Sequence, residues 1–444
     1  MNYFCTVNIN REILRLAIPA IVTNITVPLL GLIDTTIAGH LGMAEYIGAL
    51  AVGSMMFNMM YWNFAFLRMG TSGLTAQAFG ANNPDESVKI LIRATSLGAF
   101  IGLLILSLQL PIEWIALKAI KPSAEVTGYA KEYFRICIWG APALLMVMGI
   151  KGWFIGMQNS TYPMIIAIAV NIINIIASLC AVYILEMGFK GIAYGTVTAE
   201  YSGLIISFFI LSRSYKDVIG KLNFKGSLRL KEMKRFFNVN SDIFIRSLCL
   251  MSVTLAFVSI GARSGNIILA VNALIMQLFI LFSYFMDGFA FAAEALVGRF
   301  EGAGEKAGMK KCIDYLFKWG VVVMALFALV YGFGNELIFK ILTNKPDIIN
   351  TALDYRLWSV LIPVAGVSAF IWDGIFIGLT ATKQMLYSLF IASAFFFGIY
   401  FIIPGEPDNN RLWLAFISYL GMRGIAQWIM FRRIIKNKIT RASL

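Results

Sequence analysis

Residues 213–235 of this 444-residue chain read RSYKDVIGKLNFKGSLRLKEMKR, which is the longest polar stretch of the sequence and lies at its middle. On both sides long apolar runs dominate, since 59% of all residues are hydrophobic and only 14% are charged. Soluble domains carry about 25% charged residues, and so few charges cannot cover a water-facing surface of this size. The composition therefore excludes a soluble protein and predicts one that is embedded in a bilayer.

The apolar runs have the length that a membrane-spanning helix needs, which is about 20 residues for a hydrocarbon core of about 30 Å. Six runs precede the polar stretch and six follow it. We predict an all-α membrane protein with an N-terminal six-helix lobe (1–212), a cytoplasmic linker (213–235) and a C-terminal six-helix lobe (236–444). The twelve predicted spans are 13–39, 46–78, 89–111, 127–157, 161–185, 191–212, 236–261, 267–299, 314–334, 350–379, 384–403 and 411–433.

The two halves resemble each other at a spacing of 222 residues, which is half of the chain. At this spacing Gly39 aligns with Gly261, and the pattern GxFxG at 152–156 aligns with the same pattern at 374–378. A repeat with six spans per copy keeps both copies in one orientation, so we predict a pseudo-twofold axis along the membrane normal. The cleft between two such lobes is the natural path for alternating access.

Single residue types and the charge pattern exclude other classes of protein. The one histidine, His40, excludes sites that need several imidazoles, and the five cysteines match no metal cluster. No catalytic constellation lies in the spans, so we expect neither an enzyme nor a cofactor. The net charge of +13 comes largely from Lys and Arg between alternate runs. This pattern predicts cytoplasmic termini rather than a nucleic-acid partner, and we expect a monomer in the inner (cytoplasmic) membrane.

Ionisable side chains inside the spans are the main functional candidates, because a charge in hydrocarbon costs several kcal/mol. Asp34 lies in the outer half of the first span among apolar and hydroxyl-bearing residues. Such surroundings favour the neutral carboxyl group, so Asp34 could bind and release a proton during transport. The alternative is a structural carboxylate held by a nearby cation. Polar residues of spans 5 and 6 could line a pocket around Asp34 or form ordinary interhelical hydrogen bonds, namely Asn174, Ser178, Thr196 and Glu200.

A second group of ionisable residues lies nearer the predicted cytoplasmic side: Arg68, Lys151, Arg246, Asp287, Glu294 and Asp373. Lys151 and Asp373 occupy equivalent positions of the two repeats. One hypothesis is that opposite charges from the two lobes close an inner gate when the cleft opens outward. The alternative is that these residues form ion pairs within one lobe for packing.

Several segments resemble the multidrug and toxic compound extrusion (MATE) transporters, and within that family the DinF-like branch. They are FLRMGTSGLTAQAFGA (66–81), VNALIMQLF (271–279), YFMDGFAFAAEALVG (284–298) and WDGIFIGLTAT (372–382), together with the acid late in span 1. The resemblance covers essentially the whole chain. It departs from the family pattern at Ser178, where many members carry a second acid four residues after the span 5 asparagine.

The resemblance implies a secondary active antiporter that expels small organic, often cationic, compounds by rocking of two lobes. By this analogy Asp34 matches the acid implicated in coupling, with Asn174 and Thr196 as its polar partners. Asp373 is similar to the acid that sodium-coupled members use, which makes it a possible Na⁺ site. We expect exchange for protons at Asp34, alone or with Glu200. The alternatives are a sodium-coupled exporter of the same family and a lipid-linked precursor flippase of the same superfamily.

Overall fold

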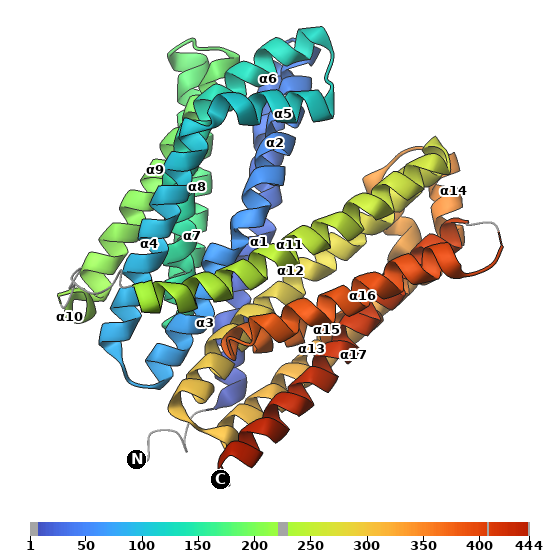
Figure 1. The fold of residues 1–444 in the computed structure, drawn as a ribbon. Coiled ribbons are helices and arrows are strands. Elements are labelled where there is room, and N and C mark those ends of the chain that lie inside the picture. Colours follow the sequence, from blue (N-terminus) through green and yellow to red (C-terminus); the bar gives the residue numbers. More distant parts are fainter. Residues whose placement is uncertain (1–7, 221–229, 406–407, 443–444) are drawn as a thin grey trace. The chain divides into compact units, whose positions relative to one another are not determined.

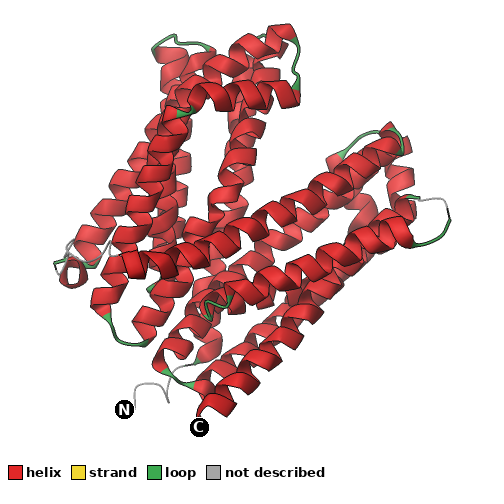
Figure 2. Cartoon of the chain, in the orientation of Figure 1, coloured by secondary structure: helices red, strands yellow, loops and turns green. Residues whose placement is uncertain are grey.

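The computed structural model describes residues 8–220, 230–405 and 408–442, and these residues form helices and loops without a strand (Figure 1, Figure 2). The predicted all-α fold is confirmed. Eleven helices in these residues are long and apolar enough to cross a membrane. The remaining predicted span, 46–78, is divided into two helices by a 3₁₀ turn. Helices prevail because a bilayer offers the backbone no hydrogen-bonding partner, so each segment must satisfy its own amides.

The chain forms two compact units, which we call the first unit (Ile18–Asn240) and the second unit (Ser241–Leu444 with the described residues before Ile18). Two helices have residues in both units: α1 (Ile9–His40) and α11 (Leu230–Arg263). The other helices of the first unit are α2 (Ala44–Tyr61), η1 (Trp62–Ala65), α3 (Phe66–Gly80), α4 (Pro84–Ser107), α5 (Gln109–Ile120), α6 (Ala124–Cys137), η2 (Ile138–Gly140), α7 (Ala141–Gly156), α8 (Thr161–Leu179), η3 (Cys180–Ile184), α9 (Phe189–Ser214) and α10 (Lys216–Ile219). Those of the second unit are α12 (Asn266–Ala303), α13 (Lys306–Leu342), α14 (Pro346–Asp354), α15 (Arg356–Gly378), α16 (Thr382–Ile402) and α17 (Asn409–Ala442).

The predicted linker 213–235 covers the end of α9, all of α10 and the start of α11. Its residues 221–229 lie outside the described part of the chain. The units divide at Ile18 and at Asn240, which are 222 residues apart, so both copies of the repeat divide at the same position. The first turns of α1 and α11 therefore belong to the unit that holds the rest of the other copy.

Side-chain contacts attach these first turns to their units. In the second unit, Arg299 of α12 donates hydrogen bonds of 3.2 and 2.5 Å to the Glu12 carboxylate of α1. In the first unit, Asn240 of α11 lies against Gly70 of α3, where an added Cβ would be 2.4 Å from Asn240 Oδ1. Ion pairing holds one junction and a glycine contact holds the other.

The repeat is visible in the closest helix packing of each unit. In the first unit, a Cβ on Gly152 of α7 would lie 2.3 Å from the Arg68 carbonyl oxygen of α3. In the second unit, a Cβ on Gly374 of α15 would lie 2.3 Å from the Ala290 carbonyl oxygen of α12. Both members of this contact recur 222 residues later. The GxFxG pattern therefore marks a backbone-to-backbone approach that only glycine allows, and it is present in both units.

Two hydrophobic clusters stabilise the first unit. The first cluster joins the end of α1 to α2, α6 and α9 through residues such as Ile37, Leu50 and Ile192. The second cluster joins α4, α7, α8 and α9 around Trp153 and Phe154. In Figure 1, α5 lies across the end of this unit rather than along its helices. The first cluster is important for function because it places Asp34.

Candidate functional site

Asp34 lies on α1, one turn before Ile37 of the first hydrophobic cluster. The residue is 7% exposed, and its Oδ1 atom has no hydrogen-bond partner. Nearby, Asn171 of α8 donates a 3.1 Å hydrogen bond to the Thr26 carbonyl oxygen of α1, two residues before Pro28. The helix that carries the acid is thus attached to α8 beside a proline, where the helix lacks a backbone donor.

Polar side chains of α8 and α9 meet close to Asp34. Asn174 Nδ2 donates a 3.2 Å hydrogen bond to Thr196 Oγ1, and Ser178 Oγ lies 3.5 Å from Asn174 Oδ1. Tyr133 of α6 connects this group to the acid, because it is within electrostatic range of Asp34 and close enough to Thr196 for a hydrogen bond. The structure therefore brings together the predicted residues of spans 1, 5 and 6.

Glu200 of α9 is the second acid of this region, and its Oε2 atom is also buried without a hydrogen-bond partner. It is within electrostatic range of Tyr61 of α2 and Cys137 of α6. Space for its carboxylate comes from Gly140, where an added Cβ would lie only 1.4 Å from Glu200 Oε2. We call the whole group the Asp34 cluster; it consists of Asp34, Tyr61, Tyr133, Cys137, Asn174, Ser178, Thr196 and Glu200.

The helices are irregular next to this cluster. A 3₁₀ turn, η1, follows Tyr61, another, η2, follows Cys137, and a π-helical turn, η3, begins two residues after Ser178. These are all the 3₁₀ and π-helical segments in the described residues, and all three lie in the first unit. Such turns free backbone groups and widen or tighten a helix, and they are frequent at functional sites.

Gly140→Ala should destabilise the protein by about 1–3 kcal/mol, because the new methyl group overpacks the Glu200 carboxylate. Thermal unfolding in detergent measures the loss. Gly128→Ala is the matched control, since it changes the preceding helix α6 at a glycine with no atom within 4 Å of an added Cβ. Combining Gly140→Ala with Glu200→Ala should recover stability, and equal losses in the single and double variants would refute this contact.

Three members of the Asp34 cluster were missed from the sequence: Tyr61, Tyr133 and Cys137. Tyr133 and Cys137 are four residues apart on α6, which places them on one face of the helix. That spacing was a usable signal, but it is equally typical of ordinary core packing. Only the fold shows that this face is turned towards Asp34 and Glu200.

The second unit contains a different kind of buried charge, which we call the Asp373 cluster. The Asp373 carboxylate of α15 forms ion pairs with Arg246 of α11 and Arg423 of α17. Gln427 of α17 donates a third hydrogen bond, of 2.6 Å, to Asp373 Oδ1. Asp287 of α12 is within electrostatic range of both arginines. Arg423 and Gln427 were missed, although an arginine inside a predicted span is a functional candidate by default.

The remaining predicted charges take separate places. Lys151 and Arg68 lie in the first unit, where Lys151 makes no ion pair with a described residue. Glu294 is buried in α12 of the second unit, and its carbonyl oxygen would be 2.9 Å from a Cβ on Gly378. Asp373 thus has its partners within its own unit, which is the alternative considered from the sequence. A pair between Lys151 and Asp373 stays a prediction.

A duplicated multi-span helical fold with a buried acid cluster is typical of a secondary transporter. The family model MatE matches this chain twice, at residues 19–179 and 243–402. The chain therefore belongs to the MatE family of membrane transporters, and the resemblance seen in its motifs is confirmed.

Individual relatives agree with this assignment. The chain is 36% identical to the DNA damage-inducible protein F of Escherichia coli strain K12, over 96% of this chain and 93% of that protein. It is 24% identical to the multidrug and toxin extrusion protein 1 of Danio rerio, over 98% of this chain and 74% of that protein. A crystal structure of MATE in the bent conformation has the same fold, with a TM-score of 0.84, 17% identity, and coverage of 99% of this chain and 98% of that one.

Proposed function

We propose that this protein exports small organic compounds across the cytoplasmic membrane in exchange for protons, and that Asp34 and Glu200 bind the protons. Both acids line one cluster in the first unit, among the hydroxyl, thiol and amide groups of their neighbours. The two termini lie in the cytoplasm in this proposal, as the positions of Lys and Arg indicate. The transporter acts as a monomer, because each chain contains both lobes.

The observation that carries the proposal is that both acids have a buried oxygen without a partner, Asp34 Oδ1 and Glu200 Oε2. Neither acid forms an ion pair with a described residue. An unpaired carboxylate in a site of low dielectric is costly, so each acid must hold a proton or face a cation. A proton and a cationic compound therefore compete for the same negative charge, which is the basis of exchange.

Movement of α1 would connect protonation to release of the compound. Among the eleven candidate spans, α1 is the least buried, and it contains Pro19 and Pro28 before Asp34. A weakly packed helix with proline bends can change its curvature at a small cost in free energy. Protonation removes the charge of Asp34, so the conformation that holds the cation loses its advantage.

The two alternative functions fit the buried charges less well. A sodium ion at Asp373 would compete with two guanidinium groups that already contact this carboxylate. A flippase for a lipid-linked pyrophosphate needs a cleft lined by unpaired cations. In the first unit the buried cluster instead contains two acids without cationic partners among the described residues. Both comparisons support proton-coupled export of cations.

The driving ion can be tested with purified protein in liposomes. We expect a pH gradient imposed in sodium-free buffer to drive transport of a cationic dye, and a protonophore to abolish it. A sodium gradient at constant pH should have no effect on the same liposomes. Dye transport driven by sodium alone would refute proton coupling, and transport driven by neither gradient would refute secondary active export of this dye.

A further inference from the structure

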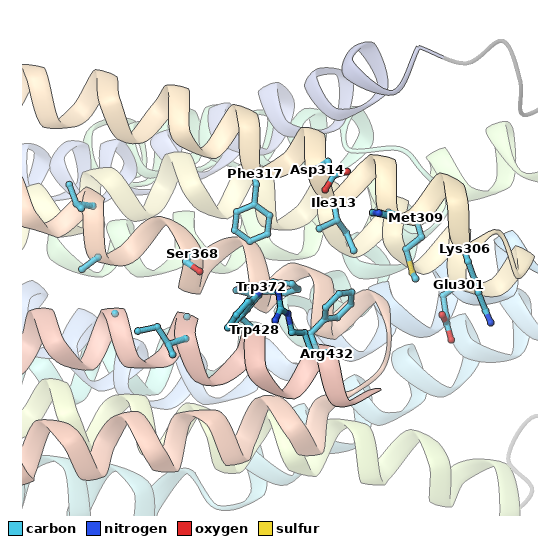
Figure 3. Close-up of a pocket in the computed structure, with 17 residues that line it drawn as sticks. Glu301, Lys306, Met309, Ile313, Asp314, Phe317, Ser368, Trp372, Trp428 and Arg432 are labelled. Carbon is cyan, nitrogen blue, oxygen red and sulfur yellow. The ribbon is translucent and has the colours of Figure 1, made fainter. Parts of the chain in front are cut away.

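The second unit contains a long groove that the transport mechanism does not use. Its volume is about 1020 Å³, and α13 and α17 form its sides while α15 forms its floor. Figure 3 shows Lys306 and Glu301 at one end of the groove and Ser368 towards the other. Most of the lining is apolar, with Ile313, Phe317 and Trp372 among its side chains. The groove thus has a polar end and an apolar length.

Three cations line the polar half of the groove: Lys306 and Lys310 of α13 and Arg432 of α17. Neither lysine forms an ion pair with a described residue. The Arg432 guanidinium lies 3.9 Å from the ring centroid of Trp428, which holds it at the groove wall. Two acids, Glu301 and Asp314, also line the groove, so the cations exceed the acids by one. This balance favours an occupant with a negative head group.

The first unit closes the equivalent space with its own chain. There α9 ends at Ser214, and the following Tyr215 packs against Trp153 and Phe154, with ring centroids 4.9 and 5.8 Å apart. In the second unit α17 instead continues as a helix to Ala442. No tyrosine occupies the position equivalent to Tyr215, which is Asn437. The repeat therefore supplies an internal comparison between a filled groove and an open one.

The charges follow the same division. Lys310 and Arg432 correspond, at the spacing of 222 residues, to Val88 and Ile210 of the first unit. Val88 is buried, and Ile210 packs against the second hydrophobic cluster. Cations thus appear at these two positions in the copy whose groove is open. A groove that merely faced hydrocarbon would not need them, because a charge in hydrocarbon is costly.

We propose that this groove binds an anionic phospholipid, whose phosphate contacts Lys310 and Arg432 and whose acyl chain lies along Ile313 and Phe317. The lysines and the arginine supply charge-assisted hydrogen bonds to the phosphate. The aromatic and aliphatic lining takes the place of neighbouring lipid tails. Because the lipid lies between α13 and α17, it fills the space that Tyr215 and its neighbours fill in the first unit.

Native mass spectrometry of the full chain in detergent tests the proposal, with phosphatidylglycerol as the probe. The variant Lys310→Val with Arg432→Ile gives the second unit the residues of the first at these positions. We expect it to bind phosphatidylglycerol about 30-fold more weakly, since each cation near a membrane contributes about 1 kcal/mol. Lys311→Val is the matched control, because Lys311 is the neighbouring lysine and does not line the groove; it should change binding less than twofold.

A second variant tests the apolar part of the groove. Gly421 lines it and has no atom within 4 Å of an added Cβ, so Gly421→Leu fills the groove without a clash. This variant should also lose the lipid while keeping all the cations. The proposal is refuted if either variant binds phosphatidylglycerol as wild type does. It is also refuted if diacylglycerol or phosphatidylcholine binds as tightly, or if inorganic phosphate displaces the lipid.

Discussion

Asp34→Asn is expected to reduce proton-driven dye export to the rate of protein-free liposomes. Asparagine keeps the size and polarity of the side chain but can neither carry a negative charge nor exchange a proton. The buried Oδ1 atom without a partner is the atom that would hold the proton or face the cation. Export from liposomes with a pH gradient in sodium-free buffer measures the effect, with dye binding at equilibrium as a second readout.

Two further variants make the result for Asp34 specific. Glu125→Gln removes an exposed acid from the same unit and should leave the export rate unchanged. Thermal unfolding of Asp34→Asn should match that of wild type, because removing an unpaired buried charge costs no ion pair. If Asp34→Asn exports dye at the wild-type rate while Glu200→Gln does not, Glu200 alone is the coupling acid and our assignment of Asp34 is wrong.

Asp373→Asn is expected to destabilise the protein by about 3–5 kcal/mol, in contrast to Asp34→Asn. The carboxylate is 6% exposed as a residue and neutralises Arg246 and Arg423, which are both buried. Its loss leaves two buried guanidinium groups of like charge close together. Thermal unfolding in detergent should show a clear fall in Tm, and less folded protein should be recovered on size-exclusion chromatography.

A compensating variant separates charge balance from shape. Asp373→Asn combined with Arg423→Met removes one charge of each sign and leaves Arg246 within range of Asp287. This double variant should recover at least half of the lost Tm. If it is as unstable as Asp373→Asn, the arginines do not depend on Asp373 for neutralisation, and the Asp373 cluster is not the ion-pair network described here.

Much of the fold could be predicted because it follows from local patterns. The length and apolarity of each run predict a spanning helix, since no other structure satisfies the backbone in lipid. The repeat was visible as the GxFxG pattern, and the structure shows what the glycines are for. Gly152 and Gly374 make equivalent close contacts with Arg68 and Ala290, which no single pattern could pair.

The candidate site was predictable only in part. Asp34, Asn174 and Glu200 were found because polar groups inside an apolar span are conspicuous. Tyr61 and Tyr133 were missed because an aromatic side chain in a span is equally typical of the core. The predicted break in none of the helices anticipated η1, η2 or η3, since 3₁₀ and π turns depend on packing rather than on a distinct local sequence.

The sequence by itself determined that this is a duplicated, all-helical membrane protein with isolated acids in its spans, because bilayer thickness and the cost of burying charge act on each segment separately. Only the tertiary structure decided which of these charges are neutralised. Asp373 is paired with residues 127 and 50 positions away, whereas Asp34 and Glu200 have no ionic partner among the described residues. Ion pairing depends on distances between side chains of different helices, and no local pattern in the chain records these distances.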